Sequence, residues 1–96
     1  MDFTAYPLRV GTVTAAAASG GALHLTVDLG GESREAHARI TERYGPDDVL
    51  GRQVVVVLSP PGAAPDEAVV LAAVSPTEGA VLLRPDTEVP AGTVVV

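Results

Sequence analysis

The sequence predicts an all-β protein: a closed five-stranded barrel with a short helix between the third and fourth strands and additional strands toward the C-terminus. Valine fills 16 of the 96 positions and only three residues are aromatic. The core must therefore be built from small branched side chains, which favour strands. Turn signals at Gly20-Gly21, Gly30-Gly31 and Pro60-Pro61 divide the chain into short apolar runs, which is typical of β-structure.

The first strand is predicted from Leu8 to Ala18. Thr12, Val13 and Thr14 favour an extended backbone, because β-branched side chains pack well on a pleated surface. Alanine has high helix propensity, but the run Ala15–Ala18 is too short to nucleate a helix alone. We therefore expect the strand to continue through the alanines.

The second and third strands follow glycine turns. The second alternates apolar with polar residues, as a strand with one buried face does, and its apolar positions are Leu23, Leu25, Val27 and Leu29. The third, Ser33 to Arg39, has a weaker pattern. We expect Ala36, Ala38 and Ile40 on one face and Glu35, His37 and Arg39 on the other. The first three strands are thus predicted to form a meander.

A short helix is predicted at Gly45-Pro46-Asp47-Asp48. Proline suits the first helical position, and the two carboxylates lie beside the positive end of the helix dipole. Gly51 ends this helix. The run from Gln53 to Leu58 then predicts a fourth strand, which we expect to be buried on both faces because it is almost entirely apolar.

The C-terminal part is predicted to contain a loop and further strands. Residues 59–67 include three prolines, which remove backbone donors from a sheet. A strand resumes from Ala68 to Val74, and another runs from Ala80 to Arg84. The chain ends in Val94–Val96, an apolar end that we expect to pack against the barrel or a second subunit.

The 96 residues predict a single domain spanning positions 1–96, small enough that pairing with a second copy is favoured. No cysteine is present, which excludes disulfides and thiolate chemistry. The N-terminal residues lack the basic start and apolar core of a secretory signal. No apolar run approaches the roughly 20 residues that span a bilayer. We expect a cytoplasmic protein without membrane association.

Candidate catalytic or metal-binding residues are scarce. Asp47 and Asp48 are neighbours on a helix, so their side chains diverge, and the helix dipole already explains them. His24 and His37 are predicted to face each other across neighbouring strands, but no third ligand has suitable spacing. No nucleotide-binding or hydrolase motif occurs. We therefore expect no enzymatic activity, no metal site and no cofactor.

The charge balance bears on nucleic-acid binding. Six arginines and twelve acids give a net charge of −6, whereas phosphate recognition normally depends on a basic patch. Residues 53–96 hold one arginine and five acids, or +1 − 5 = −4. Residues 33–52 are neutral and hold the arginines that any RNA-binding face would use: Arg34, Arg39, Arg43 and Arg52. The alternative is that these arginines pair locally with acids in solvent.

Three segments, in order, resemble signatures of the tRNA-binding-domain proteins of the oligonucleotide/oligosaccharide-binding (OB) fold, closest to the CsaA-like secretion chaperones. They are LRVGTV at residues 8–13, ITERYGP at 40–46 with LGRQV at 50–54, and LLRPD at 82–86 with VPAGT at 89–93. The resemblance covers nearly the whole chain and implies a five-stranded OB-fold barrel. It also implies a stand-alone binding protein that forms a homodimer through its terminal segments.

In that family, the tRNA-binding surface uses an asparagine just after the fourth strand, followed by a basic loop. Here Ser59 lies near the asparagine position, and residues 62–66 contain no basic residue. This difference favours a polypeptide-binding groove at Ser59, Pro60 and Pro61. We predict a non-catalytic, CsaA-like homodimer that binds extended or unfolded polypeptide. The alternatives are weak, structure-tolerant tRNA or RNA binding through the four arginines, and an assembly module that has lost ligand binding.

Overall fold

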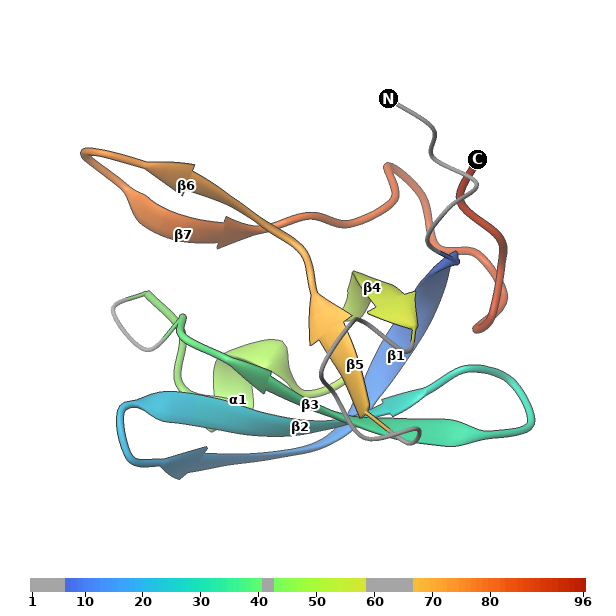
Figure 1. The fold of residues 1–96 in the computed structure, drawn as a ribbon, viewed down its shortest axis with the longest axis horizontal. Helices are drawn as coiled ribbons and strands as arrows, with labels where there is room; N and C mark the ends of the chain where they lie inside the picture. Colours follow the sequence, from blue (N-terminus) through green and yellow to red (C-terminus); the bar gives the residue numbers. More distant parts are fainter. Residues whose placement is uncertain (1–6, 41–42, 59–66) are drawn as a thin grey trace.

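A computed structural model describes residues 7–40, 43–58 and 67–96 (Figure 1). Its elements are β1 (Leu8–Ser19), β2 (Ala22–Asp28), β3 (Ser33–Ala38), α1 (Pro46–Val49), β4 (Gln53–Leu58), β5 (Glu67–Val70), β6 (Ala72–Ser75) and β7 (Gly79–Leu82). Five strands form a closed barrel in the order β1-β2-β3-β5-β4, and β6 and β7 form a separate two-stranded sheet. The predicted barrel, with its helix between the third and fourth strands and its C-terminal additions, is confirmed.

β1 is long because it has two neighbours in the barrel. Its first half pairs with β4 and its second half with β2, and the register shifts between Val13 and Ala15. The strand passes close to β2 at Gly11, where an added Cβ would lie 2.2 Å from a methyl carbon of Val27. The alanine run is strand, as predicted.

The barrel core consists of small aliphatic side chains that point inward from every strand. Leu23, Leu25, Val27, Val54 and Val56 are completely buried. The expectation that β4 is buried on both faces is wrong, because Val55 and Val57 are only half-buried. In a closed barrel only the inner face of a strand points into the core.

α1 is a single turn whose ends follow from its sequence. The Gly45 N–H donates to Oδ2 of Asp48 at 2.7 Å, so this carboxylate has a structural role at the helix start. Gly51 adopts φ +82° just after the helix, a conformation that favours glycine. No helix in the described ranges is long and apolar enough to cross a membrane.

The strand predicted from Ala68 to Val74 is in fact two strands in different sheets. The Leu71 N–H donates to the Val55 carbonyl of the barrel at 2.9 Å, while the Leu71 carbonyl accepts from the Leu83 N–H at 3.5 Å. Leu71 therefore ends the barrel strand and begins the β6–β7 hairpin (residues 72–82), which extends away from the barrel (Figure 1). The predicted end of the last strand at Arg84 is also too late, because β7 ends at Leu82.

The C-terminal tail (residues 89–96) lies along the part of β1 that β2 leaves uncovered. The Val10 N–H donates to the Thr93 carbonyl at 2.8 Å, and the Gly92 N–H donates to the Val10 carbonyl at 2.7 Å. Gly92 has φ +92°, and an added Cβ would lie 2.2 Å from the Leu29 carbonyl oxygen. The tail therefore extends the sheet at β1 through its backbone, whereas the side chains of Val94 and Val96 remain exposed, so the predicted packing of the apolar end is met only in part.

Candidate functional site

The four arginines predicted as an RNA-binding set lie on or beside β3 and α1. Arg34, on β3, has a side chain only 16% exposed, and its Nε donates to Glu32 Oε2 at 3.3 Å. Arg39, just after β3, is exposed to solvent. Arg52, just after the helix, places its guanidinium 5.7 Å from the centre of the Tyr44 ring. Two of these three cations thus already have a partner within the chain.

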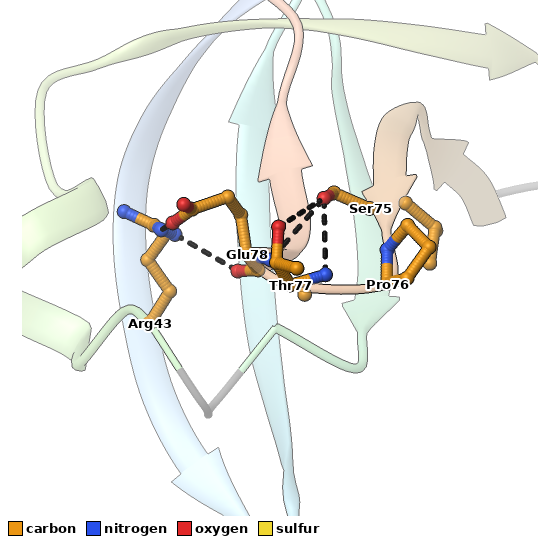
Figure 2. Close-up of a pocket in the computed structure, with 7 residues that line it drawn as sticks. Arg43, Ser75, Pro76, Thr77 and Glu78 are labelled. Atoms are coloured by element: carbon orange, nitrogen blue, oxygen red, sulfur yellow. Dashed lines mark hydrogen bonds and ion pairs between the residues drawn. The ribbon is translucent and has the colours of Figure 1, made fainter.

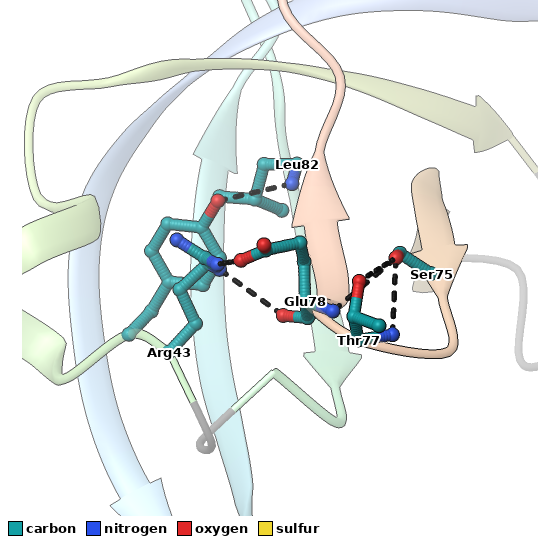
Figure 3. Close-up of polar contacts among 6 residues, drawn as sticks. Arg43, Ser75, Thr77, Glu78 and Leu82 are labelled. Carbon is teal, nitrogen blue, oxygen red and sulfur yellow. Dashed lines mark hydrogen bonds and ion pairs between the residues drawn. The ribbon is translucent and has the colours of Figure 1, made fainter.

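Arg43 and Tyr44 hold the hairpin to the barrel. Arg43 Nη2 makes an ion pair with Glu78 Oε2, and Arg43 Nε donates to the Glu78 carbonyl at 3.3 Å (Figure 3). The Tyr44 hydroxyl accepts from the Leu82 N–H of β7 at 3.1 Å. Tyr44 is itself buried in the core cluster. The R-Y pair of the central signature therefore has a structural role that the sequence alone did not reveal.

Arg43 also forms one wall of an open cavity of about 660 Å³ at the tip of the hairpin (Figure 2). Its other lining residues are Val74, Ser75, Pro76, Thr77, Glu78 and Gly79. Ser75 Oγ accepts from the N–H groups of Thr77 and Glu78 at 3.2 Å, which fixes the turn. The arginine in this cavity is engaged by Glu78, so the cavity offers no unpaired cation to a phosphate.

The two histidines meet on the outer wall of the barrel, as predicted. His24 and His37 are register partners on β2 and β3, with ring centres 4.5 Å apart. Sequence analysis placed Glu35 and His37 on the same face of the third strand. It did not predict that Glu35 Oε2 lies 2.7 Å from His24 Nε2, or that Thr26 donates to the same carboxylate at 3.3 Å. Within the described part of the chain, no group of three or more His, Cys, Asp or Glu residues is arranged to hold a metal ion.

The predicted polypeptide-binding residues Ser59, Pro60 and Pro61 lie outside the described residues. Exposed apolar side chains are found elsewhere. Val74 on β6 is 80% exposed, and in the tail Val94 and Val96 are 53% and 107% exposed. The two most exposed of these side chains, Val74 and Val96, therefore lie on the hairpin and the tail, although Leu50, Val69 and Leu83 are also exposed, at 53%, 44% and 41%.

Comparison with known proteins gives consistent matches over the whole length of the chain. The crystal structure of chaperone CsaA from Bacillus anthracis superposes with a TM-score of 0.88 at 36% identity, covering 99% of this chain and 94% of that one. The chain belongs to the CsaA-like tRNA-binding-domain family. The CsaA chaperone from Picrophilus torridus matches with a TM-score of 0.83 at 27% identity, covering 99% of this chain and 95% of that one. No family model matches the sequence.

Relatives of this CsaA-like chain also occur within much longer enzymes. The methionine–tRNA ligase of Methanothrix thermoacetophila is 45% identical over 95% of this chain, but the match covers only 14% of the ligase. The chain thus corresponds to about one seventh of that relative's length. The ligase reaction belongs to the whole enzyme and does not follow for this chain.

Proposed function

We propose that this protein is a non-catalytic, cytoplasmic, CsaA-like chaperone that binds extended or unfolded polypeptide as a homodimer. The observation that carries the proposal is the full-length match to a protein named chaperone CsaA, with 36% identity over 99% of this chain. The charge distribution supports a ligand other than RNA. The net charge is −6, and Arg34 and Arg43 are already paired with carboxylates.

A direct test measures the binding of a permanently unfolded protein and of tRNA to the same preparation. Fluorescence anisotropy with reduced, carboxymethylated lactalbumin is expected to show binding that changes little between about 50 and 200 mM salt, because apolar contacts do not release counterions. Saturable binding of tRNA without binding of the unfolded protein would contradict the proposal. The predicted polypeptide-binding role of Ser59, Pro60 and Pro61 is tested by replacing Pro60 and Pro61 together with serine, which is expected to weaken polypeptide binding.

RNA binding is the second candidate function, favoured by the match to a methionine–tRNA ligase. The exposed Arg39 is the member of the arginine set best placed to contact a phosphate. Under this function, Arg39→Gln weakens tRNA binding and reduces its salt dependence, since each phosphate contact contributes about −0.9 to the slope of log K against log salt. Arg84→Gln, which removes an equal charge outside the set, is the matched control.

The homodimer is proposed to form through the C-terminal tail. Val94 and Val96 are exposed, and an apolar strand edge in a small domain gains stability from a partner. Light scattering at micromolar concentration is expected to give twice the mass of one chain, which is 9.7 kDa. A mass of one chain would exclude the dimer. If neither tRNA nor unfolded protein binds at tens of micromolar, the third hypothesis, an assembly module without a ligand, is favoured.

A further inference from the structure

The hairpin has one edge attached to the barrel and one edge exposed to solvent. On β7, the Leu82 N–H bonds to the Tyr44 hydroxyl, and the side chains of Ala80 and Leu82 pack against the core cluster. β6 is the strand on the outer side of the hairpin (Figure 1). Its Val74 side chain is 80% exposed.

The register shows which backbone groups of β6 point outward. In an antiparallel pair, opposite residues alternate between hydrogen-bonded and non-hydrogen-bonded pairs. The bond from Leu83 N–H to the Leu71 carbonyl makes 71 and 83 a bonded pair. It follows that the pairs Ala72–Leu82 and Val74–Ala80 are non-bonded. The outward Leu82 N–H, which reaches Tyr44, agrees with this assignment.

The N–H and carbonyl groups of Ala72 and Val74 therefore face away from β7. No hydrogen bond from them to another element is found in the described part of the chain. Natural edge strands are protected by short length, charged side chains such as lysine, proline or a bulge. β6 is short, with four residues, but its sequence Ala-Ala-Val-Ser contains no charge, no proline and no bulge. An edge that is uncharged, apolar and unpaired is suited to accept another strand.

We propose that β6 is the docking edge for the polypeptide, which adds to the hairpin as a third strand through Ala72 and Val74. This inference rests on the proposed polypeptide-binding function and names a second contact surface for it in addition to residues 59–61. Charge indicates the kind of partner, because residues 67–96 carry one arginine and four acids, or +1 − 4 = −3. The best ligand is an extended apolar segment flanked by lysine or arginine, because opposite charges also accelerate encounter.

A second copy of the chain is a poorer occupant of this edge. At this edge a second copy would bring two like-charged segments together, since residues 67–96 of each chain carry a net charge of +1 − 4 = −3. A basic, extended polypeptide meets no such repulsion and supplies the alternating backbone groups that the edge requires.

The experiment uses the full chain and a synthetic peptide of alternating valine and threonine with two lysines at each end. Nuclear magnetic resonance is expected to show slower hydrogen exchange at the Ala72 and Val74 amides when the peptide is added. Val74→Pro removes the outward donor while keeping the bonds inside the hairpin, as prolines on edge strands do. We expect peptide affinity to fall about tenfold.

Val74→Thr is the matched control. It keeps the backbone N–H and a β-branched side chain of nearly the same shape at the same exposed position. This variant is expected to bind the peptide like the original protein. Unchanged exchange of the Ala73 and Val81 amides verifies that the hairpin of Val74→Pro is intact. If the hairpin of Val74→Pro is not intact, Val74→Lys is used in its place. This variant keeps the N–H but adds a charge to the edge that repels the lysines of the peptide.

The outcomes separate this inference from the function on which it rests. If the original protein binds the peptide and Val74→Pro binds it equally well, the β6 edge is wrong and polypeptide binding stands. If the original protein does not bind the peptide or unfolded lactalbumin, the proposed function itself fails. Protection of the Ala72 and Val74 amides without peptide, increasing with protein concentration, would show a second copy on the edge and overturn the proposal.

Discussion

The barrel and the β6–β7 hairpin are both built from short strands of small apolar residues, but different interactions hold them in place. The inner side chains of the barrel, such as Leu25 and Val54, are completely buried. The hairpin is attached by partial packing of Ala80 and Leu82 on the core, by the Tyr44 hydroxyl and by the contact between Arg43 and Glu78. The stability of the barrel is therefore shared among many buried contacts, whereas the position of the hairpin depends on two partly buried side chains and a few polar groups.

The largest effect is expected from a cavity in the barrel. Leu25→Ala should lower the free energy of unfolding by about 2–5 kcal/mol, because Leu25 is fully buried and its neighbours can only partly fill the space. Urea denaturation measures this change. Leu83→Ala, at a side chain 41% exposed near the hairpin, should change stability by no more than about 0.5 kcal/mol. An equal loss of unfolding free energy in both variants would contradict the difference proposed between the barrel and the hairpin.

An intermediate effect is expected where a single side chain fixes the tail. Gln53 donates from Nε2 to the Val89 carbonyl at 2.6 Å and accepts the Val89 N–H on Oε1 at 3.0 Å. Gln53→Ala leaves both backbone groups unpaired, which should cost about 1–3 kcal/mol. Faster hydrogen exchange at the Gly92 amide would report release of the tail. Gln53→Glu keeps the acceptor for the Val89 N–H but sets a carboxylate oxygen against the Val89 carbonyl, so it should lose at least as much.

A smaller and more local effect is expected at the hairpin contact. Tyr44→Phe keeps the ring in the core but removes the acceptor of the Leu82 N–H, which should cost about 0.5–1.5 kcal/mol. Hydrogen exchange is expected to accelerate at the Leu82 amide and to stay slow at the Leu25 amide. If both amides accelerate equally, the hairpin and the barrel unfold as one unit.

The same contrast explains how much the sequence could predict. The barrel was predictable because period-two alternation, as in Leu23 to Leu29, states which face is buried, and glycine turns limit the register. The break between two strands at Leu71 was not predictable, because the segment Ala68–Val74 is apolar throughout. Its division between two sheets depends on long-range backbone hydrogen bonds, which its sequence does not indicate. The side-chain contacts of Tyr44 and Gln53 join residues 36 to 38 positions apart, so no local pattern indicates them.

Of the candidate site, the alternative that the arginines pair locally with acids describes Arg34, whose partner Glu32 lies two residues away. The partner of Arg43 could not be foreseen, because Glu78 lies 35 residues away in the sequence. A local charge count treats such arginines as available, although the fold determines whether each cation is already neutralised. The exposed edge of β6 was not predicted either, because what makes it an edge is the unpaired backbone N–H and carbonyl groups of Ala72 and Val74 in the described part of the chain. Such groups occur in every residue, so the amino-acid sequence does not indicate them.

The smallest effect is expected from the Arg43–Glu78 ion pair, which lies at the surface with side chains 40% and 61% exposed. Glu78→Gln should change the free energy of unfolding by no more than about 1 kcal/mol, since solvent and salt screen exposed pairs. Its effect on binding is more informative, because it releases the Arg43 guanidinium without removing it. If the ion pair is what withholds this arginine from phosphate, tRNA affinity should rise in Glu78→Gln and return to its original level in Glu78→Gln combined with Arg43→Gln. Unchanged tRNA affinity in Glu78→Gln would mean that Arg43 serves only to hold the hairpin. In that case the net negative charge of the whole chain, rather than the single Arg43–Glu78 pair, determines how weakly the protein attracts RNA.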